Sequence, residues 1–104
     1  MIQDVNGVGL VSDGGVYSAA VAAGTATDTV IKGSAGRLCK VLVTSLGTNA
    51  LSVYDNNSVG SGLIVGQLPA SAPVGSIYSF QIPSVSGITV GGNPANPGVT
   101  LSYD

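Results

Sequence analysis

Short apolar stretches alternate along the chain with glycine, proline and small polar residues. Val, Ile and Thr, which favour strands, are abundant, whereas strong helix formers other than Ala are scarce. Apolar stretches bounded by such breaks are typical of β-strands. The pattern predicts strands at residues 8–12, 16–22, 28–33, 37–46, 50–55, 62–68, 76–82, 87–91 and 98–103. The alanines that follow residue 18 would also tolerate a short helix.

Strict alternation of apolar and polar residues is clearest near the C-terminus, in the segments 76–82 and 98–103. Ile88 and Val90 flank Thr89 in the same way. One apolar and one polar face are typical of an antiparallel sheet that is covered on one side. The apolar positions of the first two segments are Tyr78, Phe80 and Ile82, and Val99, Leu101 and Tyr103.

The segment 37–46 has apolar residues on both faces. Simple alternation places one set of them, Cys39, Val41 and Val43, on one face. The opposite face then carries Leu38, Leu42 and Leu46. We therefore expect a central strand that is covered on both sides, by the N-terminal segment or by another protomer.

The fold class that this pattern predicts is all-β, an antiparallel β-sandwich, and a jelly roll is one arrangement of it. A length of 104 residues is enough for one domain. Residues 1–27 are richer in Gly and Ala than the rest, and we interpret them as an N-terminal arm or edge layer beside a sandwich at 28–104. If they are an arm, their deletion leaves the sandwich folded; if they are an integral layer, it unfolds the domain.

Charged residues make up 8% of the chain, against about 25% in typical globular domains. A surface with so few charges is weakly protected against association, so we expect a homo-oligomer. Three dispersed basic residues and a net charge of −2 disfavour nucleic-acid binding. Polar residues interrupt every apolar run, and Met1–Asp4 lacks the features of a signal peptide, so we expect no membrane partner.

The sequence offers little catalytic chemistry. His and Glu are absent, which removes Ser-His pairs, Cys-His pairs and imidazole metal sites. The carboxylates are scattered, at Asp4, Asp13, Asp28, Asp55 and Asp104. We predict no enzyme and no catalytic, cofactor-binding or metal-binding residue, and hence no cofactor.

Three local features have a structural and a functional interpretation. Lys32, Ser34 and Lys40 could form a Ser–Lys dyad, but Lys32-Gly33-Ser34 is better explained as a turn before a strand. The segment 55–57, Asp-Asn-Asn, resembles a calcium loop superficially, but residues of this kind usually bond their own backbone in turns. The lone Cys39 is interpreted as a small buried hydrophobe rather than a reactive thiol.

Several strings in residues 28–104 resemble a class of short structural proteins of tailed bacteriophages. They are Val30–Leu38, Val41–Thr44, Val53–Asn56, Ile88–Val90 and Val99–Tyr103. The resemblance implies a virion protein assembled in the host cytoplasm, most simply a capsid decoration (cement) protein. Such a protein sits on the outer shell, binds the major capsid protein and clamps neighbouring capsomers. Proteins of this kind often assemble as trimers or dimers, so the resemblance implies a trimer or a dimer. A tail, baseplate or head-fibre component and a host- or carbohydrate-binding β-module are the alternatives.

Overall fold

The computed structural model describes residues 14–104, which form strands, turns and loops without a helix. The strands of this part of the chain are β1 (Tyr17–Val21), β2 (Thr29–Lys32), β3 (Gly36–Ser45), β4 (Ser52–Tyr54), β5 (Ile64–Gln67), β6 (Ile77–Ser84), β7 (Ile88–Val90) and β8 (Gly98–Tyr103). Each of them overlaps a strand predicted from the sequence, so the all-β prediction is confirmed. The strand predicted at 8–12 lies outside the described residues.

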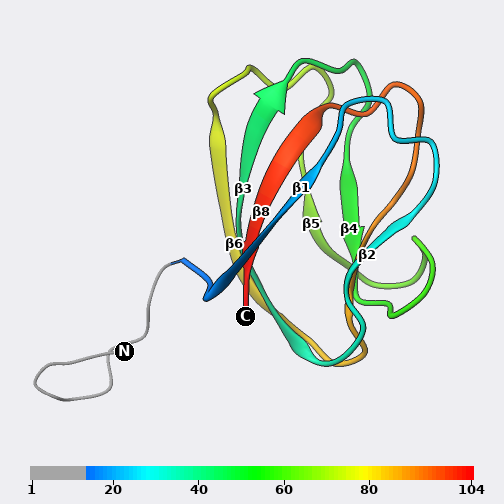
Figure 1. The fold of residues 1–104 in the computed structure, drawn as a ribbon, viewed down its shortest axis with the longest axis vertical. Helices are drawn as coiled ribbons and strands as arrows, with labels where there is room; N and C mark the ends of the chain where they lie inside the picture. Colours follow the sequence, from blue (N-terminus) through cyan, green and yellow to red (C-terminus); the bar gives the residue numbers. More distant parts are fainter. Residues whose placement is uncertain (1–13) are drawn as a thin grey trace, which may run out of the picture.

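The strands form two four-stranded antiparallel sheets (Figure 1). We call them sheet A, in the order β1-β8-β3-β6, and sheet B, in the order β2-β7-β4-β5. The first strand pairs with the last, β2 with β7, β3 with β6 and β4 with β5. A chain whose first half pairs in reverse order with its second half has the topology of an eight-stranded jelly roll. The predicted antiparallel sandwich is therefore confirmed, with the jelly-roll arrangement.

The core lies between the two sheets and is made largely of Leu, Ile and Val. Tyr78, Phe80 and Tyr103 are partly buried and pack against it, as their positions in the alternating pattern predict. Because both sheets turn one face inward, each strand contributes alternate residues. The buried members are Val21, Leu38, Val41, Val43, Leu51, Val53, Val65, Leu68, Ala72, Ile88, Val90, Val99 and Leu101.

β1 is the edge strand of sheet A and pairs along its whole length with β8. Val21 faces the core opposite Val99, and its side chain is buried. Residues 17–21 therefore form a strand and not the short helix that their alanines would tolerate. The predicted boundary near residue 28 falls directly before β2, and residues 1–13 of the predicted arm lie outside the described residues.

Two β-bulges change the faces that simple alternation predicts for β3. Between Leu38 and Lys40 the chain advances two residues while β8 advances from Tyr103 to Ser102, so Cys39 is an extra residue. The bulge places Leu38 in the core with Val41, and the prediction that Leu38 faces the other side is wrong. Leu42 lies half-buried on the outer face. The sequence therefore predicts two covered faces mainly because simple alternation does not include the bulge, and β3 needs no second covering layer to explain its apolar residues.

β6 and β7 also depart from their predicted patterns. Gln81 has a φ of 54°, at an irregularity in the pairing of β6 with β3, and Ile82 beyond it is 38% exposed instead of joining Tyr78 and Phe80 in the core. In β7 the predicted polar face is buried: Thr89 is fully buried, and its hydroxyl donates to the carbonyl oxygen of Asn56 at 2.7 Å. The β4–β5 loop supplies this bond and thus meets the outer face of sheet B.

Candidate interaction surface

Each of the three acidic side chains in residues 14–104 is used to hold loops together. Asp28, directly before β2, accepts hydrogen bonds from the amides of Gly60 and Gly92 at 2.7 and 2.8 Å. These two glycines belong to the β4–β5 and β7–β8 loops. The amide hydrogen bonds favour the ionised form and lower the pKa of Asp28.

Asp55 joins two distant turns. Its carboxylate accepts hydrogen bonds from the amides of Val85, Ser86 and Gly87 in the β6–β7 loop, and these bonds lower its pKa. The prediction that Asp55 bonds its own local backbone is therefore wrong. Its neighbour makes that turn instead.

Asn56 is the residue that forms the predicted local turn. Its side-chain oxygen accepts hydrogen bonds from the amides of Ser58 and Val59, at 2.9 and 3.0 Å. This is the backbone bonding that an Asn at the start of a turn typically makes. Residues 14–104 contain no group of three or more His, Cys, Asp or Glu side chains that could hold a metal ion.

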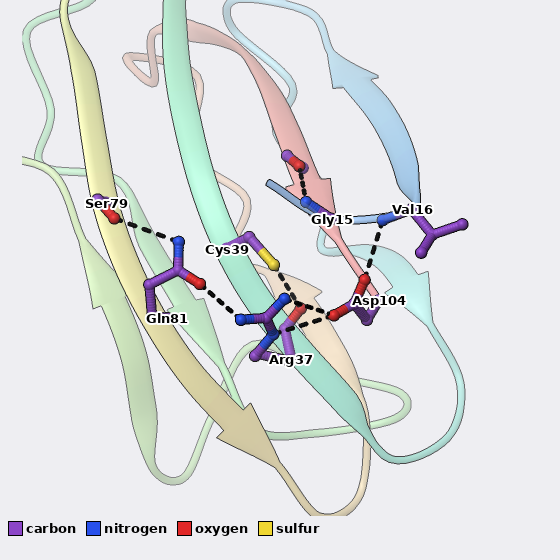
Figure 2. Close-up of polar contacts among 8 residues, drawn as sticks. Gly15, Val16, Arg37, Cys39, Ser79, Gln81 and Asp104 are labelled. Carbon is purple, nitrogen blue, oxygen red and sulfur yellow. Dashed lines mark hydrogen bonds and ion pairs between the residues drawn. The ribbon is translucent and has the colours of Figure 1, made fainter. Parts of the chain in front are cut away.

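Asp104 ends the polar network on the outer face of sheet A, which Figure 2 shows. Its carboxylate lies 2.7 Å from Nη2 of Arg37 and also accepts from the amide of Val16. The bond from Val16, and next the Arg37 guanidinium, lower the pKa of Asp104. Arg37 in turn donates to Gln81 of the edge strand β6. The network therefore links three strands and the start of β1.

The lysines, the serine and the cysteine considered above do not form a site. Lys40 lies in β3 between Ser79 and Ser102, whereas Ser34 lies in the exposed turn between β2 and β3. Within the described residues no hydrogen bond joins Ser34 to either lysine. Cys39 is buried, as predicted, and desolvation raises the pKa of its thiol.

The most distinctive surface is the side of the sandwich where the edge strands β5 and β6 lie next to each other. Ile64 begins β5 and Ile77 begins β6, and both are exposed, by 45% and 63%. Further exposed aliphatic residues lie in β6 or next to the two strands. We define the β5–β6 flank by the residues Leu63, Ile64, Val74, Ile77, Ile82 and Val85.

None of the six residues that define the β5–β6 flank is charged, although the carboxylate of Asp55 accepts a hydrogen bond from the amide of Val85. Residues 56–103 contain no Lys, Arg, Asp, Glu or His, so all of β5, β6, β7 and β8 are free of charged side chains. Natural edge strands are commonly protected from association by charged residues. The absence of charged residues from 56–103 can be read from the sequence. It would have identified this surface if the order of the strands had also been known.

The free edge of β6 is nevertheless protected against open-ended addition of strands. Pro83 lacks an amide donor, and the irregular geometry at Gln81 interrupts the regular spacing of the edge. The side chains of the β5–β6 flank remain free to pack. We therefore expect the flank to contact a partner through its side chains, and not by adding a strand to the edge of β6.

Comparisons of the chain with protein-family models, curated proteins and solved structures found no match in any of the three. Within residues 14–104 there is no helix that is long and apolar enough to span a membrane.

Proposed function

We propose that this chain is a non-enzymatic structural protein of a bacteriophage virion, a capsid decoration (cement) protein that binds the outer shell and stabilises contacts between capsomers. The observation that carries the proposal is the uncharged, aliphatic β5–β6 flank on a jelly-roll body. A protein that acts by assembly needs a rigid body and an apolar contact surface. The jelly roll is also an architecture of viral capsid proteins, which supports the proposal by analogy of fold.

The uses of the acidic side chains support the same proposal. Asp28 and Asp55 tie loops, and Asp104 joins Arg37 to the start of β1. Each carboxylate has its oxygens in hydrogen bonds with the protein, so none of them is placed to act as a general acid or base. Their contribution is to make the loops rigid, which suits a protein that clamps other subunits.

The occupant that we propose for the β5–β6 flank is a second copy of the chain. In a two-fold interface the same patch faces itself, so any charged residue near the axis meets its own copy. A flank whose own residues are uncharged avoids this repulsion, and a dimer would bury its aliphatic side chains on both copies. Of the two predicted assemblies the flank therefore favours the dimer.

The contact with the major capsid protein is assigned to the N-terminal segment. The chain is fastened to sheet A at Gly15 and Val16, whose amides donate to Ser102 and Asp104. Thirteen residues precede Gly14. At about 3.3 Å per residue, this length can span roughly 40 Å, which is enough to reach a neighbouring subunit.

Electron microscopy of the parent particle tests the proposal. We expect density for the jelly roll on the outer shell, at the junctions between capsomers, in the particle that the parent genome encodes. Capsids stripped of the protein should bind the purified full chain and become more resistant to heat. Density in the tail or baseplate, or no density in the particle, would contradict the decoration role.

A further inference from the structure

A small polar hollow lies on the outer face of sheet B, where β4 and the end of β7 meet. Ser52 and Tyr54 of β4 point away from the core because Val53 between them is buried, and Gly91 follows β7. The hollow has a volume of about 190 Å³, well below the ~300–1,000 Å³ of sites for drug-sized ligands. Its lining includes Asn49, Ser52, Tyr54, Gly91, Asn93 and Asn96.

The walls of the hollow are held by side-chain amides. Asn96 is 3% exposed; its Nδ2 donates to the carbonyl of Gly91, and its Oδ1 accepts from Nδ2 of Asn49. The side-chain oxygen of Asn93 accepts from the amide of Ala95. These bonds fix the loops before β4 and after β7 relative to each other, so the hollow is preformed.

Three polar atoms of the lining have no hydrogen-bond partner among residues 14–104. They are the side-chain oxygen of Asn49, the side-chain nitrogen of Asn93 and the hydroxyl of Tyr54. The Asn49 oxygen accepts hydrogen bonds, the Asn93 nitrogen donates them, and the Tyr54 hydroxyl does both. Sugar hydroxyl groups also both donate and accept, so a set of this kind complements them.

Charge and shape restrict the ligand further. No charged residue lines the hollow, and the nearby Asp28 has both oxygens bonded, to Gly60 and Gly92. A phosphate or a metal ion would therefore find no opposite charge. The backbone at Gly91 lies close to the Tyr54 ring, since a Cβ there would be only 3.1 Å from Cε1 of Tyr54.

We propose that this hollow binds one neutral sugar residue of a glycan, with the Tyr54 hydroxyl and the side-chain amides of Asn49 and Asn93 as its hydrogen-bonding groups. The assignment does not depend on the location of the protein in a virion. It adds a binding activity at β4 and the end of β7. None of the residues that line the hollow belongs to the β5–β6 flank.

The test is a titration of the isotope-labelled full chain, followed by NMR, with D-glucose, D-galactose, D-mannose, N-acetyl-D-glucosamine and L-rhamnose as probes. We expect at least one sugar to shift the amide signals of Gly91 and Gly92 saturably, with a dissociation constant of about a millimolar, the range of weak single-site binding. Glycerol and inorganic phosphate serve as control ligands and should not produce these shifts.

Two variants locate the binding. Tyr54→Phe should weaken it about fivefold, the value of one hydrogen bond, whereas Tyr17→Phe on β1 should leave it unchanged. Gly91→Ala should weaken it because the added Cβ would lie 3.1 Å from the Tyr54 ring and displace it, and Gly33→Ala, at a site with nothing within 4 Å, is its control. Thermal melts establish that each variant is folded.

The proposal is overturned if no sugar of the panel shifts the Gly91 and Gly92 amides up to its solubility limit. It is equally overturned if glycerol or phosphate produces the same shifts, or if folded Tyr54→Phe and Gly91→Ala both bind as the unchanged chain does.

Discussion

The two open flanks of the jelly roll differ in charge although both are formed by edge strands. On the β1–β2 flank, Asp28 precedes β2 and Lys32 ends it. Its exposed apolar side chains are Val16, Tyr17 and Val30. The β5–β6 flank exposes six aliphatic side chains and has no charged residue.

The difference shows how one fold can protect one edge and leave another available. Charges near an edge strand oppose pairing with another molecule, because burying them costs free energy. On the β1–β2 flank such charges are present, and Asp28 also fixes two loops. On the β5–β6 flank only Pro83 and the irregular backbone at Gln81 limit strand addition. We therefore expect the two flanks to respond differently to the same change.

The largest effect is expected from truncation at the β1–β2 flank. Deletion of residues 1–27 removes β1, takes Val21 from the core and uncovers β8, which should lower the free energy of unfolding by about 3–5 kcal/mol. Deletion of residues 1–13 leaves β1 in place and should change it little. Chemical denaturation of both forms checks this. Equal stability of the two would show that β1 adds nothing to the sandwich.

The next effect separates the two flanks directly. Ile64 on β5 and Val30 on β2 are 45% and 44% exposed, so Ile64→Lys and Val30→Lys are a matched pair. Ile64→Lys should weaken the dimer about 100-fold, or about 2.7 kcal/mol, because two lysines would face each other across the axis. Sedimentation velocity measures the change. A dimer that survives Ile64→Lys but not Val30→Lys would place the interface on the other flank.

A smaller effect is expected at Gly66, a buried residue of β5. A Cβ there would lie 2.7 Å from Cδ2 of Leu38 and 3.1 Å from Cδ2 of Phe80, so Gly66→Ala forces the core to shift. We expect a loss of about 1–2 kcal/mol in the free energy of unfolding, as is typical of overpacking. Thermal melts check it against Gly33→Ala, which has open space and should be neutral. If the two variants have the same thermal stability, the close packing of Gly66 against Leu38 and Phe80 does not contribute to the stability of the fold.

The smallest effect concerns pH. The pKa values of Asp28, Asp55 and Asp104 are all below the ordinary value of 3.8, so the unfolded chain takes up protons first as the pH falls. Stability from these groups is present above that value and is lost as the pH falls through the lowered values. None of the residues that define the β5–β6 flank titrates, and the pKa of Asp55 beside Val85 is lowered, so dimerisation should not change between about pH 5 and 8. Denaturation measured from about pH 5 down to about pH 2 tests the first statement, and sedimentation between about pH 5 and 8 tests the second. A dimer that dissociates within it would require a titratable group in the interface.

The local pattern predicted most of the strands. Alternation placed Val99, Leu101 and Tyr103 on the core face of β8, and it placed Tyr78 and Phe80 on the core face of β6. Such alternation reports which side of a strand is buried, because successive side chains point to opposite faces. It fails where the backbone gains a residue, as at Cys39 in β3.

The interaction surface and the hollow could not be located from the sequence, because both depend on the order of the strands. The two strands that carry or adjoin the residues of the β5–β6 flank come together because β5 and β6 are the edge strands on the same side of the two sheets. Asn49 and Asn96 meet through a hydrogen bond between loops that are distant in sequence.

By itself the sequence determined the class of the fold, the positions of the strands and the scarcity of charge, since these follow from the identities of near neighbours. The tertiary structure alone decided the jelly-roll pairing, the side to which Leu38 points and the partners of Asp28 and Asp55. These features depend on contacts between distant residues, and the period of two along a strand carries no information about which strand lies beside it.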